Sequence, residues 1–109
     1  MAALPLDELN QLHANICQAL ADPKRILILY ALAEEERNVS TLAADLEIAQ
    51  PTVSRHLRVL RQQSLVGTRR DGPSVIYYLS DKRIIAVLDT MQQVMLDALE
   101  RQTELLTAA

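Results

Sequence analysis

The chain has 109 residues, half of them hydrophobic, with no Trp or Phe and only two glycines. That length fits one domain, and a core of Leu, Ile, Val and Ala favours packed helices. No run approaches the roughly 18 uninterrupted apolar residues of a membrane span, and the N-terminus lacks the basic-then-apolar pattern of a signal peptide. The single cysteine, Cys17, cannot form an internal disulfide, so we expect a cytoplasmic protein with no membrane partner.

Charge is distributed unevenly along the chain. The net charge is −3, yet all fourteen acidic residues lie outside residues 48–70. That stretch carries five arginines: Arg55, Arg58, Arg61, Arg69 and Arg70. A solvated charged face is the simpler interpretation, but such faces usually mix both signs. A purely basic stretch in an acidic protein favours a surface that binds a polyanion.

Two helices are predicted near the N-terminus. Residues 6–20 place their apolar side chains on one face at helical spacing. Asp22 and Pro23 then end this helix and begin the next, with Asp22 as N-cap and Pro23 in the first turn. The second helix is apolar almost all round, so we expect it to be central and buried. The polar stretch 34–38 after it is expected to be an exposed connector.

Residues 40–64 have the pattern of a helix-turn-helix. Ser40 can cap a short helix that ends at Leu46, and a turn over residues 47–50 leads into a second helix that ends near residue 63 or 64. The second helix has an apolar stripe of Val53, Leu57 and Leu60. Its opposite face carries Pro51, Ser54, Arg55 and Arg58. A short helix that is apolar behind and rich in Ser and Arg in front is typical of a helix presented to a DNA groove.

A small hairpin is predicted directly after these helices. Residues 65–70 and 75–79 are β-prone, and residues 71–74 supply turn chemistry between them. Arg69 and Arg70 lie near the expected tip, where they could reach a phosphate backbone or a minor groove. A helix-turn-helix followed by a basic hairpin over residues 65–79 predicts a winged helix.

A long helix over residues 82–105 is predicted to close the chain, with Ser80 as its cap. Its apolar residues recur at heptad-like spacing: Ile84, Leu88, Met91, Met95 and Ala98. A helix of about 24 residues spans roughly 36 Å, which is longer than a core of this size needs. We therefore expect this stripe and that of residues 6–20 to form a homodimer surface; the alternative is a purely intramolecular core. The predicted fold is mainly α, with about five helices and a two-stranded wing.

Several segments resemble a known family. They are ADPKRILIL at residues 21–29, QPTVSRHLRVL at 50–60, LV at 65–66, and RDG with VIYYL at 70–72 and 75–79. In this order they are similar to the ArsR/SmtB family, small dimeric winged-helix repressors of bacteria and archaea, over about residues 15–90. The resemblance implies a dimer built from the first and last helices. It also implies binding to an imperfect inverted repeat of double-stranded DNA, and in many members an inducer, often a metal, that weakens this binding.

The metal sites of the family do not carry over to this chain. Members with a thiolate site have Cys-x-Cys where this chain has Asn38-Val39-Ser40. Members with a zinc site on the last helix have Asp and His ligands at positions that are here Asp81, Arg83, Val94 and Asp97. We therefore expect neither metal site, and no cofactor.

The DNA contacts are assigned to the basic stretch. We expect the major-groove residues to be Gln50, Pro51, Thr52, Ser54, Arg55 and His56, and the residues holding phosphates to be Arg58, Arg61, Arg69 and Arg70. His56 flanks the apolar stripe, so a structural hydrogen bond remains an alternative to a base contact. A winged helix used for protein–protein contact is the alternative function. An enzyme is not expected, because no catalytic triad, carboxylate pair or phosphate loop is recognisable.

A sensor for the inducing signal is harder to identify. His13 and Cys17 lie four residues apart on the first helix, so their side chains are neighbours. A thiol sensor activated by His13 is one interpretation. The alternative is a small buried cysteine beside a partly exposed histidine. A small-molecule inducer and a redox inducer both stay open.

Overall fold

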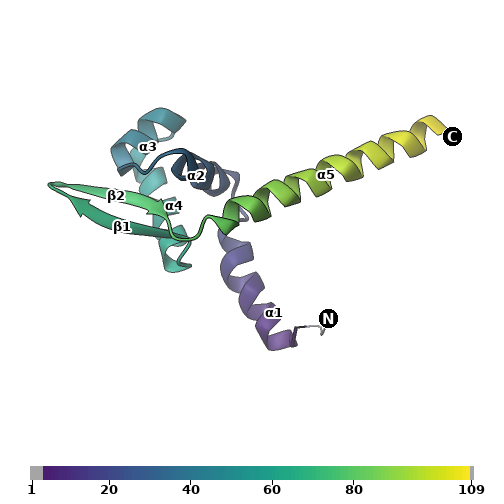
Figure 1. The fold of residues 1–109 in the computed structure, drawn as a ribbon, viewed down its shortest axis with the longest axis horizontal. Helices are drawn as coiled ribbons and strands as arrows, with labels where there is room; N and C mark the ends of the chain where they lie inside the picture. The colour runs from purple at the N-terminus through teal and green to yellow at the C-terminus, as the bar shows by residue number, and fades with distance from the viewer. Residues whose placement is uncertain (1–3, 109) are drawn as a thin grey trace.

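The computed structural model describes residues 4–108, with eight elements in chain order. They are α1 (Leu6–Leu12), the π-helical turn η1 (His13–Cys17), α2 (Pro23–Glu34), α3 (Val39–Leu46), α4 (Gln50–Gln62), β1 (Val66–Asp71), β2 (Ser74–Leu79) and α5 (Arg83–Ala108). The helices α2, α3 and α4 pack together with the hairpin, while α1 and α5 project away from this body (Figure 1). The prediction of a mainly helical winged helix is confirmed.

Caps explain where the helices begin, and two of the three predicted caps are wrong. Asp22 caps α2 as predicted, because its carboxylate accepts a hydrogen bond of 2.8 Å from the Lys24 amide. For α3 the cap is Asn38, whose side chain accepts from the Thr41 amide at 2.8 Å; Ser40 already lies inside the helix. At the start of α5 the Asp81 carboxylate accepts from the Arg83 amide, whereas the Ser80 amide donates to Leu65.

The core lies between α2, α3 and α4. Its largest fully buried side chains are Ile28, Leu29, Leu42, Val53, Leu57 and Leu60. The apolar stripe predicted for the second helix of the helix-turn-helix is therefore confirmed. The prediction that α2 is central and buried holds for Ile28, Leu29, Ala31 and Leu32, but Leu27 on the same helix is 45% exposed. α2 packs on α3, α4, β2 and α5, and Leu27 borders a surface pocket together with Asp45 and Leu46 of α3.

The hairpin forms the wing and is attached to the body. Its strands pair antiparallel from Val66 opposite Leu79 to Asp71 opposite Ser74, around a turn of Gly72 and Pro73. The Arg37 and Tyr77 backbones exchange two hydrogen bonds, of 2.8 and 3.2 Å. The stretch 34–38 is therefore only partly the exposed connector that was predicted, because Arg37 ties it to the wing.

A large apolar surface stays uncovered in the protomer. Residues 13–17 adopt a π-helical turn in place of the single regular helix predicted, and only Ile16, Ala19 and Leu20 near the end of this segment pack on the core. Large exposed apolar residues follow along α5: Val87, Met91, Val94, Met95, Leu96 and Leu99. The radius of gyration is 17.2 Å, against about 13 Å for a compact chain of this length. Within residues 4–108, much of both terminal helices therefore lacks a partner.

Two leucines on α2 test the position of the core. Leu29 is fully buried and Leu27 is exposed, on the same helix. Leu29→Ala should lower the free energy of unfolding by about 2–5 kcal/mol, because it leaves a cavity. Leu27→Ala is the matched control and should cost well under half as much. Urea unfolding at one fixed protomer concentration measures both, and equal costs would contradict this core.

Candidate nucleic-acid interface

The outer face of α4 is the most basic surface of the helix-turn-helix. Gln50, Pro51, Ser54, Arg55, Arg58 and Arg61 are exposed, and Thr52 is half-buried. Because Val53, Leu57 and Leu60 face the core, these residues point away from it. Sequence periodicity thus predicted correctly which side of α4 faces outward.

The turn before α4 aims the start of this helix outward. Glu47 adopts a left-handed conformation, with φ of 55°, and closes α3 by donating from its amide to Ala44. The next helix starts after Ala49, with Pro51 in its first turn and no acidic residue there. The partial positive charge at this helix end is therefore not neutralised by a carboxylate of the first turn, and it favours an anionic partner.

The two wing arginines differ, although sequence analysis treated them alike. Arg70 is exposed and lies opposite Val75, in the pair next to the Asp71–Ser74 pair that flanks the turn. Arg69 donates a hydrogen bond to the Glu36 carboxylate, which raises the pKa of the Arg69 guanidinium. Because the Arg69 side chain is 51% exposed and a guanidinium has five N–H donors, a phosphate can still reach Arg69 beside Glu36, but it meets a partly neutralised charge.

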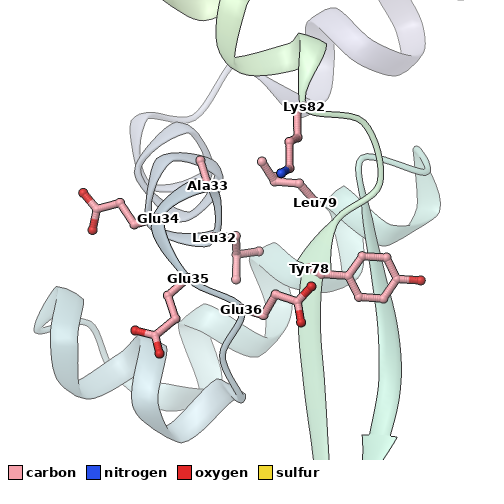
Figure 2. Close-up of a pocket in the computed structure, with 8 residues that line it drawn as sticks. All are labelled: Leu32, Ala33, Glu34, Glu35, Glu36, Tyr78, Leu79 and Lys82. Atoms are coloured by element: carbon pink, nitrogen blue, oxygen red, sulfur yellow. The ribbon is translucent and has the colours of Figure 1, made fainter.

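A small cavity lies beside Glu36. It has a volume of about 190 Å³, between the end of α2 and the end of β2. Figure 2 shows Glu36 pointing toward β2 and Tyr78, while Glu34 and Glu35 point away from it. Gly67 opposes Tyr78 on the paired strand, and a Cβ there would lie 2.6 Å from the tyrosine ring. The cavity is bordered by Glu34, Glu35, Glu36 and Lys82, and no residue of α4 lines it.

His56 belongs to the inside of α4. Its side chain is only 7% exposed, with Nδ1 3.3 Å from the Arg25 Nη1 and Nε2 3.9 Å from an Asp22 carboxylate oxygen. Burial lowers the pKa of His56, since charge is costly away from water. Of the two roles left open by the sequence, the structure supports the structural hydrogen bond. The two ring nitrogens face Arg25 of α2 and Asp22, the N-cap of α2, so the ring does not point outward where a DNA groove would lie.

The candidate sensor residues both lie at the protomer surface. His13 and Cys17 are exposed, so the alternative of a buried cysteine is wrong for the protomer.

Within residues 4–108 no group of three or more His, Cys, Asp or Glu side chains is placed to hold a metal ion. At one family metal position, Asp81 instead pairs with Arg83, which lowers the pKa of the Asp81 carboxyl to about 2. Among the described helices none is long and apolar enough to cross a membrane.

Comparisons with known proteins agree with this geometry. Residues 22–68 match the model of the arsR family of bacterial regulatory proteins. The nodulation protein NolR of Rhizobium meliloti is 37% identical over 77% of this chain and 69% of its own length. A transcriptional repressor SmtB homolog of Synechocystis is 42% identical over 75% of this chain, which spans 61% of that protein. A homodimeric winged helix-turn-helix DNA-binding domain, Mb0332 of Mycobacterium bovis, superposes with a TM-score of 0.74 at 29% identity, covering 93% of this chain and 95% of that one.

Proposed function

The chain belongs to the ArsR family of bacterial regulatory proteins, and we propose on this premise that it is a homodimeric transcriptional repressor that binds an inverted-repeat operator. One observation carries the proposal. The outward face of α4 combines Gln50, Ser54 and three arginines with no acidic residue, and it rests on a fully buried apolar stripe. A rigid helix with such a face fits a major groove.

The roles within this face follow from side-chain chemistry. Gln50 and Arg55 can form paired hydrogen bonds with adenine and guanine edges respectively, and Thr52 and Ser54 can contact either. Pro51 fixes the backbone of the first turn. His56 is left out of this set because its ring is buried against α2.

The remaining arginines would hold the phosphate backbone. Arg58 and Arg61 continue the exposed face of α4, and Arg70 lies on the wing. Arg69, which is half-exposed and paired with Glu36, would add a weaker contact. Phosphate contacts fix the register of the protein on DNA, whereas the α4 side chains near the groove select the sequence.

The dimer would be built from α1 and α5. Both helices carry exposed apolar residues, including Leu9, Met91 and Met95. Large apolar patches on a protein surface commonly mark an interface. A two-fold axis would present two α4 helices to successive turns of DNA, which a single protomer cannot do.

The releasing signal would act in the cytoplasm, where the operator lies. Neither family metal site has its ligands, so a small molecule or an oxidant is the better candidate class. Cys17, exposed beside His13, is the residue to test for the oxidant.

Selection of bound duplexes from a random pool tests the function directly. The chain should enrich an inverted repeat whose half-sites lie about 10–10.5 base pairs apart, or a multiple of this spacing. Recovery of no preferred sequence, with binding equal for all duplexes, would contradict an operator-binding repressor. A protein partner that duplex DNA does not displace would favour the alternative of a protein–protein module.

The salt dependence of binding tests the phosphate contacts. Arg58→Gln should reduce the slope of log affinity against log salt concentration by about 1.8 for the dimer, because one phosphate contact, worth about 0.9, is lost in each of the two protomers. Arg101→Gln removes the same charge from the far part of α5 and should leave the slope unchanged. Fluorescence anisotropy with the selected duplex, over a salt series, measures both variants. An unchanged slope for Arg58→Gln would remove Arg58 from the interface.

A charge on α5 tests the dimer. Met95→Glu places a carboxylate within the exposed apolar stripe and should shift the chain toward monomers in sedimentation velocity. Gln93→Glu adds the same group on the opposite face of the helix and should leave dimers intact. If both variants sediment like the unmodified chain, α5 does not form the interface.

A further inference from the structure

Arg25 lies where three parts of the fold meet. Its Nε donates a hydrogen bond of 2.7 Å to the Ala19 carbonyl, and its Nη2 donates one of 3.0 Å to the Gln18 carbonyl. Its Nη1 lies 3.3 Å from Nδ1 of His56. One planar guanidinium in α2 therefore contacts both the end of the N-terminal helical segment and the helix that carries the basic face.

This contact fixes the chemical state of His56. A guanidinium has only N–H donors, so Nδ1 of His56 must act as an acceptor without a proton. The neutral ring then carries its proton on Nε2, which faces the Asp22 carboxylate at 3.9 Å. A second proton on Nδ1 would set two donors, and two positive charges, against each other.

We propose that Arg25 is a positioning residue for DNA binding, and that it holds α4 against the end of the N-terminal segment through the neutral ring of His56. The inference rests on the proposed function and adds what keeps the reading helix in place. A lysine could not replace Arg25, because one ammonium cannot reach two carbonyls and a ring nitrogen in the same plane.

The position of Arg25 also connects the two surfaces of the molecule. Gln18 and Ala19 follow directly after His13–Cys17, in the segment proposed to join the dimer. A shift of this segment would move the carbonyls that hold Arg25, and Arg25 contacts α4. Changes at the dimer surface can therefore reach the DNA-reading face through one side chain.

The same geometry gives DNA binding a dependence on pH. The charged groups acting on His56 are Asp22, which favours the protonated ring, and Arg25, Arg55 and Lys24, which disfavour it; burial disfavours it most. The folded pKa lies below the ordinary 6.5, so acid favours states in which the ring has left its place. The Arg25–His56 contact is fully present above the ordinary pKa of 6.5, and it is lost as the pH falls through the lower pKa of the folded protein.

Duplex affinity between about pH 7.5 and 5.5 tests the proposal, in a range where the DNA phosphates stay ionised and histidine titrates. The unmodified chain should lose about tenfold in affinity, a loss of the size usual for coupling between two sites, because the protonated ring cannot accept from Arg25. His56→Asn keeps an acceptor near the Nδ1 position and cannot titrate, so its affinity should stay level with pH. His13→Asn removes the other histidine and should follow the unmodified chain. Arg25→Lys should bind at least about tenfold more weakly at pH 7.5. Circular dichroism and sedimentation should show that this variant is still a folded dimer.

Several results would overturn the positioning role. These are an acid loss that persists in His56→Asn, an Arg25→Lys variant that binds as tightly as the unmodified chain, or an affinity that does not fall in acid. Nitrogen NMR of the unmodified chain gives a check that does not depend on any variant folding, since a proton on Nδ1 at neutral pH would contradict the Arg25 contact. Absence of duplex binding at every pH would instead overturn the proposed function, and the inference with it.

Discussion

The two-sided character of α4 is the constraint on which the rest of the structure depends. Val53, Leu57 and Leu60 are fully buried, and burying one such side chain contributes roughly 1.5–3 kcal/mol. The helix is therefore held mainly by its apolar face, with the Arg25–His56 contact beside it, and its outer face is free to carry polar side chains. Because three buried positions fix its rotation, the angle at which Ser54 and Arg55 point outward is fixed as well. The direction of the outer face of α4 is thus set by the packing of its inner face, and the outer side chains need not make contacts within the protomer.

The wing depends on a different contact. A two-stranded hairpin is marginal alone in water, so it needs an attachment to the body. Arg37 and Tyr77 provide it through two backbone hydrogen bonds, and the Tyr78 ring packs across Gly67. Arg37 also pairs with Asp45 of α3, which joins the wing, the end of α2 and the helix-turn-helix in one unit. The wing and α4 are consequently held in a fixed relation to each other before any DNA is bound.

Much of this could be predicted from the sequence, because period and turn chemistry are local. The helix-turn-helix, the hairpin and the apolar stripe of α4 all follow from residues close together in the chain. What could not be predicted depends on distant residues. Arg69 and Glu36 are 33 positions apart, and His56 and Arg25 are 31 apart, so no local pattern reveals either pair. The caps at Asn38 and Asp81 were missed for a related reason. Ser, Asn and Asp are about equally good N-cap residues, so the backbone path before each helix decides which of them caps it.

The acidic composition of the rest of the chain can now be given a physical role. Residues 48–70 hold five arginines, and all fourteen acids lie elsewhere. A duplex approaching the end of α2 meets Glu34 and Glu35, which are exposed and point away from the wing (Figure 2). Like charges repel over about 8–10 Å at physiological salt, so wrong orientations are disfavoured before contact. Two acids lie close to the basic surface: Asp71 follows Arg70 at the end of β1, and Glu36 pairs with Arg69. Because the Arg69–Glu36 pair is half-exposed and uses one guanidinium nitrogen, the other Arg69 donors stay accessible to an anion.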